Sequence, residues 1–268
     1  MFRGDNSFGQ GPKLSGIPAF FELVWIKALL NIKAELHRSY LSYGWWIIEP
    51  LLHMGVFFIV FGILLKRGEG DFLTFLLTGL IPWMWFMKGV TVSSNSILTG
   101  DNVLRTVRTS PAFFPLASVA QTTLKQIPVM MILLSLVVFR GQSPSVYWFA
   151  LAPVMLTQLV LMAFASCFVA AIIPFFRDLS FLVPTGLQFV MFMSGTFYDY
   201  RTIPIEWQGL FLLNPMAFLL KCYRDVFLEN TWPQMDVLAM WFAASLLLCL
   251  ITVYVMNKLR HIYPRVIV

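Results

Sequence analysis

Apolar residues occur along this chain in long continuous runs that are separated by short polar segments. Six of these runs reach the length of about 20 residues that a helix needs to cross a hydrocarbon layer of about 30 Å. They are 45–65, 72–92, 116–139, 147–173, 181–198 and 237–256. The runs do not alternate with period two, so the pattern predicts transmembrane helices rather than a membrane barrel.

A seventh apolar run, 209–220, is too short to cross and is interrupted by Asn214 and Pro215. It predicts short re-entrant or interfacial helices between the fifth and sixth spans. The expected fold is therefore an all-α polytopic membrane protein with six transmembrane helices. Its expected organisation is a cytoplasmic N-terminal segment (1–44), a transmembrane domain (45–256) and a cytoplasmic tail (257–268).

Ahead of the first span, residues 19–38 follow a helical period with one apolar and one polar stripe. The apolar stripe includes Phe21, Trp25 and Leu29, and the polar stripe includes Lys27 and Glu35. This pattern predicts an amphipathic interface helix along the inner membrane surface. The helix is either a passive anchor or a docking ledge for a cytoplasmic partner, and its expected interface residues are Phe21, Trp25, Lys27, Lys33 and Arg38.

A second amphipathic segment lies in the loop between the second and third spans. Asp101 can cap a short helix that Pro111 ends. The apolar side of this helix includes Leu104, and its basic side carries Arg105 and Arg108. Held between two spans, such a helix can transmit a push, although taken alone the segment is also consistent with an ordinary loop turn.

Composition and charge agree with a membrane protein. Of the 268 residues, 59% are hydrophobic and only 12% are charged, which is about half the charged share of a soluble domain. Lysine and arginine are concentrated on the side of the predicted topology that holds both ends of the chain, so the positive-inside rule places both termini in the cytoplasm. Anionic headgroups explain the net charge of +6, and we expect no nucleic-acid partner.

The sequence lacks the motifs of common enzymes. It contains no G-x-x-x-x-G-K-[ST] phosphate loop, no H-E-x-x-H pair and no G-x-S-x-G elbow. The acidic residues are scattered, and two of the cysteines, Cys167 and Cys249, lie within spans, which indicates packing residues. We therefore expect no catalytic residue, no metal site and no cofactor bound by this chain.

Several ionisable side chains interrupt the apolar runs. Glu49 and His53 lie four residues apart on one face of the first span, and Lys88 and Lys125 lie in the second and third. A charge at membrane depth costs about 2.5–3.5 kcal/mol and therefore seeks water or a partner. We expect Glu49 to face a channel entrance, to pair with a base such as Arg38, to bond to His53, or to extend to the interface. The lysines either line a polar path or reach the boundary along their alkyl chains.

Aromatic residues collect near the predicted outer ends of the second and fifth spans. They lie in the stretches GLIPWMWF (79–86) and SGTFYDYRTIPIEW (194–207). An interfacial belt explains most of them. The second stretch also surrounds a predicted helix break, and broken helices at membrane depth line cavities or pack in protein.

Taken in order, the motifs resemble a known family. After the amphipathic helix come RSYLSYGWWIIEPLL, GLIPWMWF, SPAFFPLASV, FFRDLSFLVP, MSGTFYD, IPIEW and LLNPMAFLLKCYRDVFL. Their order and spacing resemble the membrane subunit of bacterial ABC exporters for polysaccharides, the type that exports O-antigen or capsule chains. The resemblance covers about residues 20–256.

The resemblance implies a transport subunit of the bacterial inner membrane that exports a lipid-linked polysaccharide. It implies a homodimer with a channel at its interface and two copies of an ATP-binding cassette subunit, which binds ATP and Mg. The residues expected to couple to that subunit are Asp101, Asn102, Leu104, Arg105 and Arg108. The channel or gate candidates are Glu49, His53, Trp83, Trp85, Phe86, Lys88, Phe197, Tyr198 and Tyr200.

Other functions stay open at this point. A secondary transporter predicts two halves of similar hydropathy with paired broken helices, and the sequence has no convincing internal repeat. A membrane-bound enzyme or scaffold predicts a polar cluster or a soluble appendage. Within the resemblance, the alternatives are export of capsular polysaccharide, teichoic acid, another lipid or a drug.

Overall fold

The described part of the chain consists of helices joined by turns and loops, with no strand. A computed structural model describes residues 17–38, 42–57, 59–60, 64, 72–100, 110–142 and 144–266. Its main helices are α1 (Ile17–Arg38), α2 (Ser42–Phe57), α3 (Phe72–Ser94), α4 (Ser96–Thr99), α6 (Phe113–Phe139), α7 (Leu151–Ile172), α8 (Leu179–Met193), α9 (Ile205–Leu212), α10 (Pro215–Phe227), α11 (Met235–Lys258) and α12 (Tyr263–Val266). The described residues also form two short 3-10 helices, η2 (Val146–Ala150) and η3 (Tyr200–Thr202). The prediction of an all-α fold is confirmed for these residues.

Four helices in the described residues are long and apolar enough to cross a membrane: α3, α6, α11 and the continuous helix formed by η2 and α7. Each matches one predicted span. The fifth predicted span corresponds to α8, whose 15 residues extend over about 22 Å, less than the hydrocarbon layer. The helix ends at Met193, with Ser194 as its C-cap, and the next residue, Gly195, has a φ of +72°, which leaves the helical conformation. The first predicted span begins as α2, which has 16 described residues.

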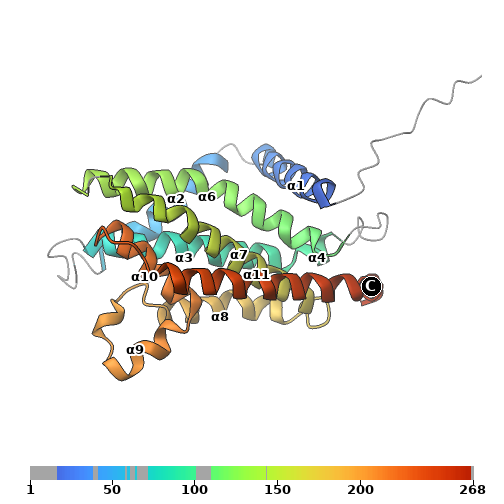
Figure 1. Cartoon of the computed structure of the whole chain (residues 1–268). Helices are drawn as coiled ribbons and strands as arrows, with labels where there is room; N and C mark the ends of the chain where they lie inside the picture. The colour runs from blue at the N-terminus through green and yellow to red at the C-terminus, as the bar shows by residue number, and fades with distance from the viewer. Residues whose placement is uncertain are drawn as a thin grey trace, which may run out of the picture.

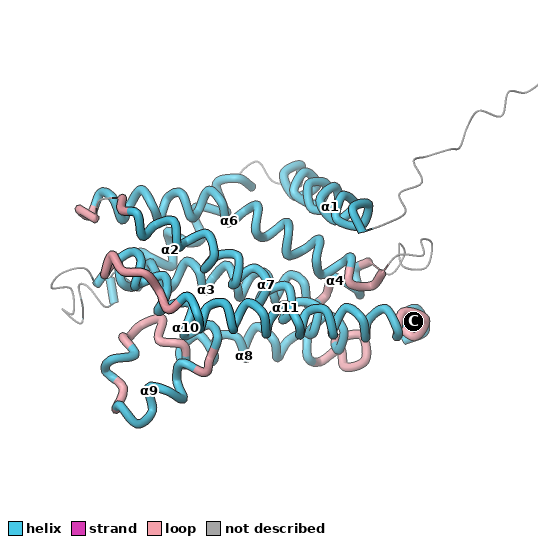
Figure 2. The backbone as a smooth tube through the Cα atoms, in the orientation of Figure 1, coloured by secondary structure: helices cyan, strands magenta, loops and turns pink. Residues whose placement is uncertain are grey.

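The bundle is organised around α3. This helix contacts α6, α7, α8 and α10. Of the residues in its apolar 18-residue stretch, 72% are buried. Figures 1 and 2 show α3 at the centre, with α6 above it and α8 below it. By contrast, α11 packs mainly on α7, and only 17% of the residues in its apolar 18-residue stretch are buried. Its outward residues are apolar, as expected for a helix that faces lipid.

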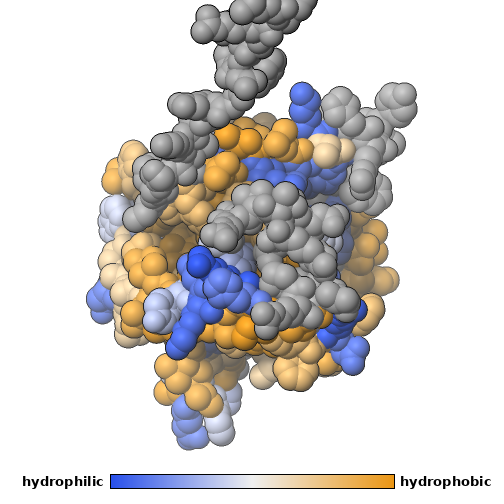
Figure 3. All heavy atoms as spheres, turned by 90° about the vertical axis from the view of Figure 1, so that its right-hand side faces the viewer, coloured by the Kyte–Doolittle hydropathy of each residue, from blue (hydrophilic) through white to orange (hydrophobic). Residues whose placement is uncertain are grey.

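The helix α1 packs its small and polar side against α6. Val24 and Ala28 are buried at this contact, whereas Phe21 and Trp25 are 62% and 51% exposed. The predicted helix and its stripes are therefore present, with the apolar stripe pointing away from the bundle. In Figure 1, α1 lies at the same end of the molecule as α4 and the C-terminus. Figure 3 looks onto this end, where hydrophilic residues form patches and apolar residues cover most of the sides.

The predicted break at Asn214 and Pro215 separates α9 from α10. Asn214 is the N-cap of α10, and its side chain accepts a hydrogen bond from the backbone N–H of Met216 at 3.0 Å. Pro215 occupies the first turn, where its missing N–H costs nothing. Asn214 Nδ2 also donates to Ser194 Oγ at 2.9 Å, which ties the end of α8 to the start of α10.

Candidate functional site

Two ion pairs join the N-terminal helices to the bundle. Lys88 Nζ on α3 donates to Glu49 Oε2 on α2 at 2.7 Å, with both side chains about one-third exposed. Lys125 on α6 pairs with Glu35 on α1. Lys88 and Lys125 lie within candidate membrane spans. Their charges are therefore neutralised by the chain itself, which offsets the cost of placing an ammonium group at membrane depth.

The partner of Glu49 was not one that the sequence singled out. Its carboxylate pairs with Lys88, whereas the ring Nδ1 of His53 lies 2.9 Å from the backbone carbonyl oxygen of Glu49. The side chain of Arg38 lies outside the described residues. Glu49 and Lys88 are both channel candidates, and the structure brings them into direct contact. The ion pair therefore joins α2 to α3, whereas the histidine contact stays within one turn of α2.

A row of polar side chains continues from Lys125 along the contact between α1 and α6. Asn31 Nδ2 donates to Gln121 Oε1 at 3.2 Å, and Gln121 Nε2 donates to a carboxylate oxygen of Glu35 at 3.1 Å. The polar stripe of α1 thus meets a polar stripe of α6. Lipid offers these groups no hydrogen-bond partner, so pairing them inside the protein is favourable.

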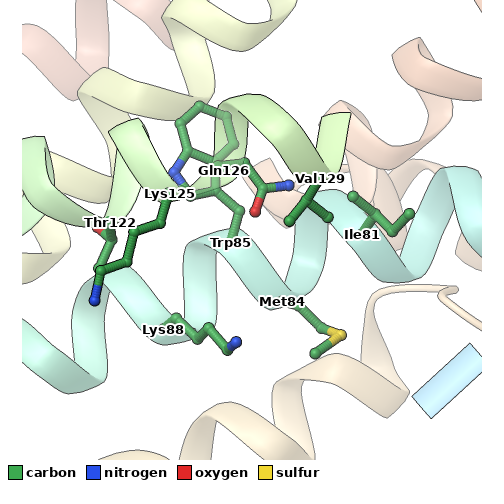
Figure 4. Close-up of a pocket in the computed structure, with 8 residues that line it drawn as sticks. All are labelled: Ile81, Met84, Trp85, Lys88, Thr122, Lys125, Gln126 and Val129. Atoms are coloured by element: carbon green, nitrogen blue, oxygen red, sulfur yellow. The ribbon is translucent and has the colours of Figure 1, made fainter. Parts of the chain in front are cut away.

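Two cavities are lined in part by polar residues of α6. The larger has a volume of about 450 Å³, lies beside α1 and α4, and is lined by Lys27, Asn31, Val92, Ser96, Thr99, Gly100, Phe114, Ala117, Ser118 and Gln121. The smaller, about 50 Å³, lies between α3 and α6. Figure 4 shows its lining residues, which are Ile81, Met84, Trp85, Lys88, Thr122, Lys125, Gln126 and Val129. We call this smaller space the donor cavity, because every charged side chain that lines it is a lysine.

At the opposite end of the bundle, Arg224 of α10 is buried against α3. Its guanidinium carbon lies 3.6 Å from the centre of the Phe75 ring, and Nη2 donates to the backbone oxygen of Thr196 at 3.0 Å. A Cβ atom on Gly79 would lie 2.6 Å from Nη2. A larger residue at position 79 would force the guanidinium to shift from this position.

Charged groups surround Tyr200 near this arginine. The cationic groups of Arg201 and Lys221 lie 5.6 Å and 5.8 Å from the centre of its ring. Lys221 also pairs with Asp225 at 3.3 Å, and Arg201 pairs with Glu229. Burial raises the pKa of Asp225, and Lys221 partly offsets that rise. These contacts hold η3 against α10, so Tyr200 belongs to an ordered cluster rather than to a free loop.

A buried network of hydrogen bonds links α10, α7 and α3. Tyr223 donates from its hydroxyl to Gln158 Oε1, and Gln158 Nε2 donates to the carbonyl oxygen of Pro82, both at 2.7 Å. Tyr223 and Gln158 are fully buried. These hydrogen bonds fix α10 and α7 to α3 beside Pro82, which lies within α3. Such networks specify one arrangement of helices because each member would otherwise be unsatisfied.

The remaining aromatic candidates lie in packed surroundings. Trp83 and Phe86 belong to the main core, with ring centres 5.8 Å apart, and Trp85 lines the donor cavity. Phe197 stacks on Phe192, with ring centres 5.2 Å apart, and the ring centres of Tyr198 and Phe211 lie 6.0 Å apart. Whether any of these residues faces a channel stays a prediction.

Other candidates divide between described and undescribed parts of the chain. Lys27 lines the larger cavity, and Lys33 is exposed on α1. The predicted coupling residues Asp101, Asn102, Leu104, Arg105 and Arg108 lie outside the described residues. Reasoning from the sequence missed the glutamines at 121, 126 and 158, which line or link these polar sites. Their presence within apolar runs was the available signal, because an amide also needs a partner at membrane depth.

No group of three or more potential metal ligands is found among the described residues.

Comparison with known proteins decides the family. The sequence model of the family described as ABC-2 type transporter matches residues 24–228, which is most of the chain. This chain belongs to the ABC-2 type transporter family. The match runs from α1 through α10, so both ion pairs, both cavities and Arg224 lie within the family domain.

Individual relatives of this ABC-2 type transporter extend over most of its length. The chain is 23% identical to the O-antigen export system permease protein RfbA of Klebsiella pneumoniae over 248 residues, which is 92% of this chain and 95% of the relative. It is 29% identical to the RfbA protein of Myxococcus xanthus over 220 residues, 81% and 85% of the two chains. It is 24% identical to the polysialic acid transport protein KpsM of Escherichia coli over 203 residues, 74% and 78% of the two chains.

Proposed function

We propose that this ABC-2 type transporter is the permease subunit that exports a cell-surface polysaccharide across the bacterial inner membrane. The observation that carries the proposal is the near full-length similarity to permeases named for O-antigen export, together with the polysialic acid transport protein. The apolar helices provide a membrane domain, as export requires. An O-antigen or similar lipid-linked polymer is the proposed cargo.

The energy for export comes, in this proposal, from ATP and Mg bound by a separate ATP-binding cassette subunit. Two such subunits would bind a homodimer of this chain at its cytoplasmic end. The absence of a phosphate loop from the sequence supports a separate ATPase. The position of α1 beside α4 and the C-terminus supports a shared docking end, with α1 and the segment 101–108 as its contacts.

The proposed topology has six spans with both termini in the cytoplasm. In this arrangement α2 and α8 belong to the spans that are not among the four long helices, and each exposes a broad apolar face. Leu52 and Val56 on α2 are exposed, as are Phe181 and Phe189 on α8. These faces would meet lipid or the second copy of the chain, where the channel is proposed to lie.

A strain that lacks only this chain should stop displaying its polysaccharide. Polymer should accumulate inside the cell, because synthesis would continue while the permease is absent, and the wild-type chain should restore display. Surface labelling with a lectin or antibody, alongside the polymer content of lysed cells, measures both effects. Unchanged surface polymer would contradict the proposal, and an altered export of a drug in the same strain would support the competing substrate class.

A further inference from the structure

A groove of about 350 Å³ lies between α7 and α11, near the end of the bundle that holds the C-terminus (Figure 1). Its walls are apolar side chains of the two helices: Phe168, Ala171 and Ile172 of α7, and Ile251, Val255 and Leu259 of α11. Both helices are among the candidate membrane spans, and they pack closely on each other. We call this space the apolar groove.

The two polar side chains that line the apolar groove are already paired within the chain. Thr252 Oγ1 donates to the backbone oxygen of Leu248 at 2.8 Å, and the hydroxyl of Tyr263 donates to the backbone oxygen of Ala171 at 3.3 Å. The rings of Phe175 and Tyr263 pack together, with centres 5.7 Å apart. The lining side chains therefore offer a ligand apolar contact without a free hydrogen-bonding group, which favours an alkyl chain over a sugar.

The size and the opening of the apolar groove also suit part of a lipid chain. An apolar cavity of about 150 Å³ stays dry and holds one benzene molecule, and the groove has more than twice that volume. Phe176, Ile251 and Val255 line it and are between 42% and 65% exposed, so the groove opens at the side of the bundle. Because the medium beside a membrane-spanning helix is hydrocarbon, an acyl chain can enter there directly from the bilayer.

Basic residues adjoin the apolar groove at the same end of the bundle. Lys258 and Arg260 flank Leu259 in the sequence, and Arg177 comes directly after the lining residues on the α7 side. All three side chains are exposed, and no carboxylate in the described part of the chain pairs with Lys258 or Arg260. Asp178 is the acidic residue next to Arg177, so positive charge is in excess. Basic residues beside a membrane attract anionic headgroups, so this end favours a lipid with negative charge.

We propose that the apolar groove binds an anionic phospholipid, with one acyl chain between α7 and α11 and the phosphate beside Lys258 and Arg260. The chain of the bound lipid contacts α7, α11 and Tyr263 of α12, so it joins these three helices at one end of the bundle. In the proposed topology this end is cytoplasmic, and the lipid belongs to the inner leaflet. The site does not depend on which cargo is exported.

Lipid titrations of the purified full-length chain in detergent, followed by native mass spectrometry, test the site. The probes are phosphatidylglycerol, which is anionic, and phosphatidylethanolamine, which has no net charge. We expect the wild type to bind phosphatidylglycerol roughly tenfold more tightly, because the basic residues attract its headgroup. Lys258→Gln/Arg260→Gln should remove most of this preference and leave the affinity for phosphatidylethanolamine unchanged.

Two variants that fill the apolar groove test the position of the acyl chain. Ala171→Phe and Ile251→Trp each place a larger side chain on a wall of the groove, so both lipids should bind roughly tenfold more weakly. The matched control is Ala152→Phe, the same substitution at an exposed position of α7 outside the groove, where binding should be unchanged. Thermal unfolding without added lipid shows that each variant is folded before its affinity is compared.

Equal affinity of the wild type for the two lipids would overturn an anionic ligand. Equal affinity in the wild type and in both filling variants would overturn the groove as the site, as would an equal loss in Ala152→Phe. Light scattering of the same samples tests the other occupant: a dimer that Ala171→Phe and Ile251→Trp convert to a monomer would assign the groove to a second copy of the chain and overturn the lipid site.

Discussion

The double variant Arg105→Glu/Arg108→Glu is expected to abolish polysaccharide export while the chain stays in the membrane. The two arginines form the basic side of the predicted short helix at 101–108. The flanking elements, α4 and the start of α6, lie at the same end of the bundle as α1 and the C-terminus. Reversing both charges there would replace attraction to an ATPase by repulsion, which costs several kcal/mol at a close contact.

Two readings of this variant separate coupling from folding. Surface polymer should fall to the level of the deletion strain, and the ATPase should no longer co-purify with the chain. The matched control is Lys258→Glu/Arg260→Glu, which makes the same charge change at the exposed end of α11. If a general loss of basic residues on that side disturbed topology, both variants would fail alike. Normal export from Arg105→Glu/Arg108→Glu would refute a coupling role.

The variant Lys88→Glu is expected to remove export, and the exchanged pair Glu49→Lys/Lys88→Glu is expected to recover much of it. The single change places two carboxylates where an ion pair of 2.7 Å now lies. An unpaired charge at membrane depth costs about 2.5–3.5 kcal/mol on insertion scales, and like charges add repulsion. The exchange restores attraction, although the cation then sits on α2 instead of α3.

Export and the thermal stability of the purified chain measure this effect together. The same exchange at the second pair, Glu35→Lys/Lys125→Glu, is the comparison, because it joins α1 rather than α2 to the bundle. Failure of the exchanged pair to improve on Lys88→Glu, with the chain still inserted, would show that attraction between positions 49 and 88 is not what export requires.

The long helices could be predicted from the sequence because the bilayer fixes their length. The runs 72–92, 147–173 and 237–256 correspond to α3 (Phe72–Ser94), the helix from Val146 to Ile172, and α11 (Met235–Lys258). The prediction of a helix over 181–198 was wrong at its outer end, because α8 ends before Gly195, which has a positive φ. Apolar side chains continue past that glycine, so hydropathy alone did not reveal the turn.

The orientation of α1 could not be read from its amphipathic pattern. In water, an apolar stripe predicts the buried face, but a protein surrounded by lipid can bury either stripe. The structure packs the side of α1 that carries Asn31 and Glu35 against α6 and leaves Trp25 exposed. Two stripes were therefore recognised correctly, and only the three-dimensional arrangement assigns them to a neighbour.

The partners of the buried charges also required the fold. Glu49 and Lys88 are 39 residues apart in sequence, and Glu35 and Lys125 are 90 apart. Each residue stood out in the sequence as polar within or beside an apolar run, but spacing along the chain says nothing about which helices are neighbours. Arg38, which sequence proximity suggested for Glu49, has no described side chain.

Reconstitution tests the central claim most directly: this chain provides the membrane path, and a separate ATPase provides the energy. The chain alone, the chain with its ATPase, and the ATPase alone should be compared in vesicles of bacterial lipid, measuring ATP turnover and movement of labelled polymer. We predict ATP-dependent movement of polymer only when both proteins are present, and no ATP turnover by the chain alone. Robust ATP hydrolysis by the purified chain, or polymer movement without any ATPase, would contradict the account.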